Sequence, residues 1–282
     1  MYLCSLFKIY TMKKFKRHKD YGFWDQDIRL SKLSDLGDPL EKLNNGIDFE
    51  MFRGLLEEKL SKAPQGSSGR PPYDYVLMFK ILILQRYYNL SDGQVEFQIN
   101  DRMSFMRFPD LSMADDIPDC KTVWHFREQL TDPDLMDELF SLFLKELGKL
   151  HLTVNEGKII DASFVEASRQ RNTRAENAQI KAGEGDSLWN DKPHRKRQKD
   201  IDAHWTQKNE VDYYGYKNHV KQDARSKLIT DCWVTDASVH DSNATDVLLN
   251  ENDRGEEFYA DSAYSGAPQE EIIEDRGMIN RV

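Results

Sequence analysis

Two aspartates, each at the end of a short apolar run, are the residues of this sequence best suited to chemistry. Asp161 follows two isoleucines, and Asp261 follows the run Phe258–Ala260. Runs this short, bounded by charged residues and glycine, predict buried strands, and an aspartate at their end lies where a sheet opens to solvent. Two such carboxylates on neighbouring strands would form an oxygen-rich pocket for a hard divalent cation such as Mg²⁺. Two such ions about 3.5–4 Å apart can activate a nucleophile and stabilise the leaving oxygen of a phosphodiester.

A structural role for each aspartate is the competing interpretation. An aspartate after a strand often caps a turn or the next helix, and either residue taken alone favours that role. The interpretation of the pair therefore depends on what lies between them. Two segments there carry dense patterns of aromatic and polar residues, at Tyr213–Val220 and at Val239–Ser242.

The order of these segments carries a resemblance to a known family. The first contains Tyr-Gly-Tyr-Lys-Asn-His at 214–219, and the second reads Val-His-Asp-Ser at 239–242. Together they resemble a bacterial insertion-sequence transposase of the DDE type, in the group called insertion sequence family five. The resemblance covers nearly the whole chain, and Leu36–Leu43 is similar to the opening of the family's N-terminal domain. It implies a ribonuclease H-like domain in which two aspartates, matched by Asp161 and Asp261, and a later glutamate hold metal.

The resemblance also implies cofactors and partners. Two Mg²⁺ or Mn²⁺ ions are expected in the complete site, and double-stranded DNA, as element ends and as target, is the expected substrate. The protein is expected to act as a homo-oligomer on DNA in the bacterial cytoplasm. The implied reaction is DNA transposition by metal-dependent cleavage followed by strand transfer.

The family's glutamate has no assigned counterpart in this sequence. Glu270, Glu271 and Glu274 lie on the predicted helix directly after Asp261, whereas the family's glutamate lies on a later helix. We therefore expect a ribonuclease H-like domain cut off before its third carboxylate. Two alternatives stay open: a catalytically incomplete DNA-binding remnant that modulates a full-length transposase, and a nuclease that only hydrolyses DNA.

Polar residues near the aspartates are candidates for supporting roles. His240 and Asp241 are expected to lie behind the metal ligands, and His219 is expected to position groups or contact DNA near the site. The histidine spacing matches no zinc motif, and Mg²⁺ prefers oxygen ligands. Tyr213, Tyr214 and Tyr216 favour packing over base stacking.

Charge is unevenly distributed along the chain, whose formal net charge is −10. Residues 166–227 hold 14 Lys and Arg against 10 Asp and Glu, whereas residues 228–282 hold three against 13. Because phosphate binding is electrostatic, a local basic face can bind DNA even on an acidic protein, although a solvated surface has the same pattern. The predicted DNA contacts are Arg169, Arg171, Arg174, Arg195, Lys196, Arg197, Lys199, Lys217 and His219, together with Lys121 and Arg127 in the N-terminal part.

The cysteines and the N-terminal residues exclude some kinds of metal site and targeting segment. Cys4, Cys120 and Cys232 are far apart, which excludes a Cys-x-x-Cys zinc site and fits a reducing compartment. The apolar run before Tyr10 precedes the basic run Lys13–Lys19, the reverse of a signal peptide, and is too short to span a membrane. Met12 is an alternative start.

Periodicity predicts an α+β chain with an all-helical N-terminal domain followed by an incomplete ribonuclease H-like α/β domain. Residues 1–62 form an arm and helices that start at Asp38 and Asp48, and residues 63–150 form a helical domain expected to bind DNA ends. Residues 151–282 form the catalytic domain. Predicted strands there end at Asp161, cover 213–222 and 228–235, and end at Asp261. A long loop or partly disordered insertion is expected over Arg169–Lys199 because apolar residues are scarce.

Overall fold

The computed structural model describes residues 22–61, 71–153, 155–208 and 210–282. These residues form two compact units that divide between Leu142 and Phe143. The first unit is helical in its described residues and the second combines a mixed sheet with helices, so the predicted α+β class is confirmed. The basic run Lys13–Lys19, the alternative start at Met12 and most of the predicted linker 63–72 lie outside the described residues.

The helices of the N-terminal unit begin where the sequence places capping residues. The side chains of Asp38 and Asp48 each accept a hydrogen bond at 3.0 Å from the backbone amide two residues later. Ser91 and Gln94 form a capping box at the start of α5. The elements are α1 (Asp25–Asp35), α2 (Pro39–Gly46), η1 (Phe49–Phe52), α3 (Arg53–Leu60), α4 (Tyr75–Tyr87), α5 (Asp92–Asp101), α6 (Met103–Arg107), α7 (Cys120–Gln129) and α8 (Pro133–Lys149).

The segments before and after residue 62, where a domain boundary was expected, pack against each other. Helices α3 and α4 pack against each other within one unit. The functional division at 62 and 150 stays a prediction. No helix in the described part of the chain is long and apolar enough to cross a membrane.

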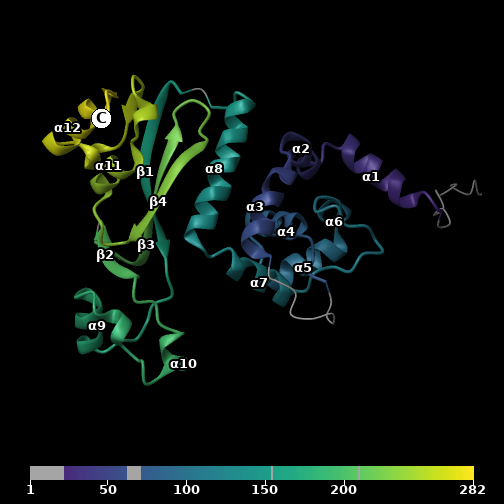
Figure 1. The fold of residues 1–282 in the computed structure, drawn as a ribbon, viewed down its shortest axis with the longest axis horizontal. Helices are drawn as coiled ribbons and strands as arrows, with labels where there is room; N and C mark the ends of the chain where they lie inside the picture. Colours follow the sequence, from purple (N-terminus) through teal and green to yellow (C-terminus); the bar gives the residue numbers. More distant parts are fainter. Residues whose placement is uncertain (1–21, 62–70, 154, 209) are drawn as a thin grey trace, which may run out of the picture. The chain divides into compact units, whose positions relative to one another are not determined.

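The second unit begins with the last turns of α8, and strands and short helices follow (Figure 1). Its elements are β1 (Gly157–Glu166), α9 (Arg174–Lys181), η2 (Gly185–Ser187), α10 (Pro193–Lys196), β2 (His204–Lys208), β3 (Val211–Asp223), β4 (Ile229–Asp236), η3 (Asp241–Asn243), α11 (Ala244–Leu248), η4 (Glu251–Asp253), β5 (Glu257–Tyr259), η5 (Ser262–Tyr264), α12 (Ala267–Asp275) and β6 (Ile279–Asn280). The strands form one sheet in the order β2-β3-β1-β5-β6, and β4 also pairs with β3. Strands β1, β2 and β4 are antiparallel to β3, whereas β1-β5 and β5-β6 pair in parallel.

Strand β1 is longer than the sequence suggests, so the predicted end at Asp161 is wrong. Its antiparallel pairing with β3 continues to Glu166, opposite Gly215. Its parallel pairing with β5 stops at Ile159, opposite Tyr259. Asp161 therefore lies inside β1, just beyond the point where its neighbour β5 ends. The long partner strand β3 keeps β1 extended past the aspartate.

The segment expected to be a loop over Arg169–Lys199 is instead folded. Helix α9 starts at a capping box made by Thr173 and Glu176. Glu176 also accepts hydrogen bonds from the indole of Trp189 at 2.8 Å and from Arg195 at 2.9 Å. One buried tryptophan and a few polar contacts order this segment. Because the segment has so few apolar residues, its helices produce no periodic pattern in the sequence.

One side of the sheet carries the apolar core of this unit. The core side chains are Ile160, Ala244, Leu248, Leu249, Phe258, Tyr264, Ile273 and Met278. Because opposite residues of an antiparallel pair share a face, Lys221 and His219 of β3 lie on the same covered face as Ile160 and Ala162 of β1. The ammonium of Lys221 is buried and pairs with Asp253 at 2.9 Å.

Candidate functional site

The structure brings the two aspartates to one cavity. Asp161 and Asp261 line a shallow cavity of about 720 Å³ where β1 passes the end of β5. The other lining residues are Ile159, Ile160, Gln222, Ala224, Lys227, Tyr259 and Ala260. Both aspartates are exposed, so their oxygens are accessible to a ligand. Among the residues that the structure describes, no group of three or more His, Cys, Asp or Glu is placed to hold a metal ion.

Each aspartate uses one oxygen locally and leaves the other without a hydrogen bond from a described residue. Asp161 Oδ1 accepts from the amide of Ala162 at 2.8 Å. Asp261 Oδ1 accepts from the amide of Ala263 at 2.9 Å and caps η5. The structural interpretation therefore holds for one oxygen of Asp261. The second oxygens of the two carboxylates remain available as ligands.

The hydroxyl of Tyr264 is buried and feels the charges of three carboxylates. Its side chain is 1% exposed, and its hydroxyl has no hydrogen-bond partner among the described residues. Burial, together with the charges of Asp241, Asp161 and Asp261, raises the pKa of this hydroxyl. The charges of all three carboxylates therefore act on one buried hydroxyl.

Asp241 and His240 both have local partners. Asp241 pairs with the ammonium of Lys217 at 2.8 Å. His240 is exposed and caps η3, with its Nδ1 accepting from the amide of Ser242 at 3.3 Å. The supporting roles of His240 and Asp241 near the metal ligands therefore stay predictions.

His219 and Lys217 are buried, which conflicts with direct DNA contact. His219 is 0% exposed, and its Nε2 lies 2.9 Å from Thr235 Oγ1. Since that hydroxyl donates to Asp236 O at 3.0 Å, Nε2 of His219 is the donor and Nδ1 carries no proton. Burial lowers the pKa of His219, Asp241 opposes this shift and Lys217 adds to it. A DNA phosphate has no access to either side chain because the core-facing side of β3 is covered.

The basic segment before β2 divides into exposed and structural residues. Arg195, Lys196 and Lys199 are half-buried, and each donates hydrogen bonds within the segment. Four of the predicted DNA contacts in this segment are exposed, namely Arg169, Arg171, Arg174 and Arg197. The guanidinium of Arg169 lies 5.3 Å from the ring of Trp205, which is 49% exposed. Sequence reasoning missed this aromatic residue because strand β2 itself was not expected.

In the N-terminal unit, the two predicted DNA contacts differ. Lys121 is exposed on α7. Arg127 pairs with Asp92 at 2.6 Å and donates to Gln85 at 3.2 Å. Arg127 therefore links α7 to α4 and α5, and these contacts explain why an arginine lies at this position.

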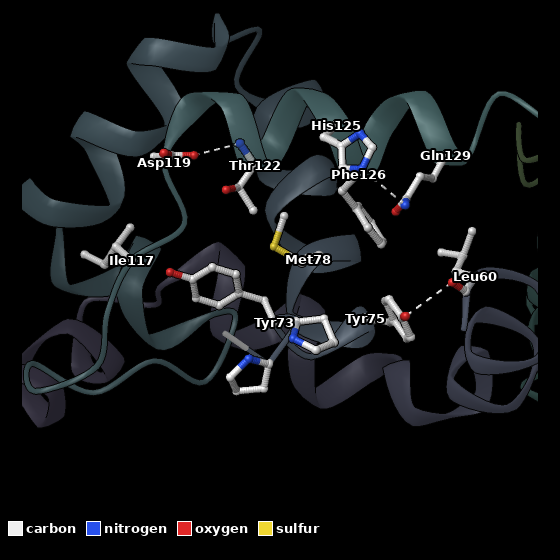
Figure 2. Close-up of a pocket in the computed structure, with 12 residues that line it drawn as sticks. Leu60, Tyr73, Tyr75, Met78, Ile117, Asp119, Thr122, His125, Phe126 and Gln129 are labelled. Carbon is white, nitrogen blue, oxygen red and sulfur yellow. Dashed lines mark hydrogen bonds between the residues drawn. The ribbon is translucent and has the colours of Figure 1, made fainter. Parts of the chain in front are cut away.

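A second cavity lies within the N-terminal unit (Figure 2). It measures about 540 Å³, and its apolar wall includes the side chains of Tyr75, Met78 and Phe126. Polar groups from α7 and its capping residue also line it. They are Asp119, Thr122, His125 and Gln129. In Figure 2 the hydroxyl of Tyr75 donates to the carbonyl of Leu60, at 3.3 Å.

Two family models match the chain in succession. A transposase domain (DUF772) matches residues 28–129, and a transposase DDE domain matches residues 153–279. The second match contains both Asp161 and Asp261. No solved structure matches the chain significantly. Assignment to insertion sequence family five stays a prediction. The two matches, the helical first unit and the mixed-sheet second unit agree, and the chain belongs to the insertion-sequence DDE transposases.

Proposed function

We propose that this transposase binds the ends of its insertion sequence as duplex DNA and catalyses metal-dependent strand cleavage and strand transfer. The observation that supports the proposal is the shared cavity of Asp161 and Asp261 on the matched DDE domain. Homo-oligomerisation on DNA belongs to the same proposal.

The residues of the cavity fit a hard divalent cation. Each carboxylate has one oxygen that accepts no hydrogen bond from a described residue. Mg²⁺ commonly binds one or two carboxylates and completes its shell with water and substrate phosphates, so two aspartates are a sufficient protein contribution. Asp161 and Asp261 would hold Mg²⁺ or Mn²⁺, which when bound supplies charge stabilisation at the phosphodiester.

The remaining roles belong to other parts of the second unit. Asp161 is held by β1, and Asp261 by the start of η5, so the two carboxylates are positioned by different elements. The exposed arginines of the segment before β2, with Arg169 beside Trp205, are suited to backbone phosphates. These contacts would hold a duplex through charge, with no base recognition required.

The test uses Asp161→Asn and Asp261→Asn in the full chain. We expect each variant to lose about 100-fold or more of metal-dependent nicking of an element-end duplex, the scale seen when one charge-stabilising group is removed. Duplex binding should stay within about twofold, since neither carboxylate attracts phosphate. Asp212→Asn, an exposed acid at the start of β3, is the matched control and should nick at the wild-type rate. Wild-type nicking by either cavity variant would contradict the assignment.

A pre-nicked end separates this function from its rivals. A duplex with a free 3′-hydroxyl at the element end is supplied together with a second, unrelated duplex. A transposase joins the two, a simple nuclease only hydrolyses, and a DNA-binding remnant binds without either product. Joining that depends on both aspartates is the result expected here.

A further inference from the structure

The aspartate cavity also contains a basic side chain that the sequence did not point to. Lys227 lines the cavity from the turn between β3 and β4, opposite in charge to Asp161 and Asp261. It is exposed and forms no ion pair with any residue that the structure describes. The other basic side chain of the turn, Arg225, is paired with both oxygens of Glu156 at 2.9 Å. One of the two cations is therefore neutralised, and the other is available at the cavity.

The turn that carries Lys227 is held firmly. Asp223 is 0% exposed, and its Oδ1 accepts from the amide of Ser226 at 2.7 Å and from that of Arg225 at 3.1 Å. Its Oδ2 accepts from the amide of Asn155 at 2.8 Å, which fastens the turn to the segment before β1. The amide of Lys227 donates to the carbonyl of Asp223 at 3.0 Å. A buried carboxylate thus fixes the backbone from which the ammonium extends.

The backbone of Lys227 is in the left-handed region, with φ of 62°. Glycine or asparagine adopts this conformation readily, whereas another residue costs roughly 1 kcal/mol. A lysine at a position that favours glycine is a local departure from turn chemistry. Unusual backbone conformations of this kind are found at functional sites, and the side chain of Lys227 lines the cavity.

A positively charged side chain at the cavity would favour binding of a DNA phosphate there. Two carboxylates repel a phosphodiester, and a divalent ion held by them would offset that repulsion without giving the site a net positive charge. An ammonium group is a point charge well suited to a phosphate oxygen. We propose that Lys227 is a substrate-binding residue, whose ammonium holds a phosphate of the DNA strand bound at the Asp161–Asp261 cavity. This assignment rests on the proposed function.

The experiment compares Lys227→Asn and Lys227→Arg with Arg225→Gln in the full chain. Asparagine tolerates the left-handed backbone, arginine retains the charge, and Arg225→Gln removes a charge from the same turn away from the cavity. In Mn²⁺, we expect Lys227→Asn to bind a fluorescent duplex about five-fold more weakly, with a salt dependence lower by about one phosphate contact. The other two variants should stay within about twofold of wild type.

A second readout needs no DNA. Mn²⁺ binding, followed by water-proton relaxation, should be about two- to five-fold tighter in Lys227→Asn, because a positive charge beside the carboxylates is removed. Arg225→Gln should leave it unchanged, and Asp161→Asn should weaken it strongly. If Asp161→Asn leaves Mn²⁺ affinity unchanged, the proposed function fails. If that control behaves as expected but Lys227→Asn leaves DNA binding unchanged, only the assignment of Lys227 is overturned.

Discussion

Single buried polar side chains show how close the core of the sheet comes to the candidate site. Tyr264 belongs to the apolar core, yet its hydroxyl faces the charges of three aspartates without a hydrogen-bond partner among the described residues. The neutral imidazole ring of His219 lies on the same covered side of the sheet. Such groups carry a free-energy cost that a substitution can reveal.

Tyr264→Phe is expected to raise the free energy of unfolding by about 1 kcal/mol, because it removes a buried hydroxyl that makes no bond to the described chain. Urea denaturation measures the change. Tyr75→Phe is the matched control, since it removes a hydroxyl that donates to Leu60 O at 3.3 Å, and it should lower stability slightly. A clear loss of stability in Tyr264→Phe would contradict the prediction.

His219 makes stability depend on pH. Its pKa in the folded chain is below the ordinary value of 6.5, so above that pH both states are neutral and the residue contributes no pH dependence. As the pH falls below about 6.5, the unfolded state binds the proton more readily, and stability decreases. Melting temperatures between pH 8 and pH 5 test this. His219→Gln should flatten the curve in this window, and an unchanged curve in this variant would contradict the prediction.

At the scale of elements, the Tyr-Gly-Tyr-Lys motif is explained by strand pairing. Gly215 has φ of 145°, and a Cβ there would lie 2.2 Å from Val165 O and 2.6 Å from Ala167 N. The glycine permits the close approach of β1 and β3 at the end of their pairing. Since β1 carries Asp161, this contact also supports the strand that positions the cavity.

Gly215→Ala is therefore expected to cost about 3 kcal/mol or more, because the added methyl group meets backbone atoms that cannot move aside. Gly93→Ala in α5 meets nothing within 4 Å and should leave stability unchanged or raise it by roughly 0.5–1 kcal/mol. Thermal denaturation of both variants decides the point. Equal stability of the two would show that the β1-β3 approach is looser than described.

At the scale of the whole molecule, the two units and the two family matches divide the chain in the same order. The helical unit coincides with the transposase domain match, and the sheet unit with the DDE domain match. The Asp161–Asp261 cavity, the exposed arginines before β2 and Lys227 all belong to the second unit. Metal and phosphate binding are thus expected to stabilise that unit in particular.

Mn²⁺ or Mg²⁺ should raise the melting temperature of the full chain. A ligand that binds only the folded state contributes about 2.7 kcal/mol at a hundred times its Kd. The effect should be lost in Asp161→Asn and Asp261→Asn and retained in the control Asp212→Asn. Differential scanning fluorimetry with added metal, reversed by a chelator, measures it. A metal-independent melting temperature in wild type would count against the cavity as a metal site.

Local signals in the sequence determined much of this protein. Capping residues such as Asp38 and Asp48 marked helix starts, and the motifs at 214–219 and 239–242 indicated the transposase family. These features act over a few residues, so they can be recognised without knowing the fold. The same local logic failed for the segment over 169–199, whose order depends on one buried tryptophan and its polar partners.

Only the tertiary structure decided which face of β3 is covered and which side chains share the cavity. The alternation of Lys217, His219 and Lys221 with Tyr216 and Asn218 predicts a strand, but hydrophobicity alone would place the lysines in solvent. They are buried instead, because Asp241 and Asp253 pair with them from elements distant in sequence. The meeting of Asp161, Asp261 and Lys227 likewise depends on strand register and on where β5 ends, which local sequence patterns do not encode.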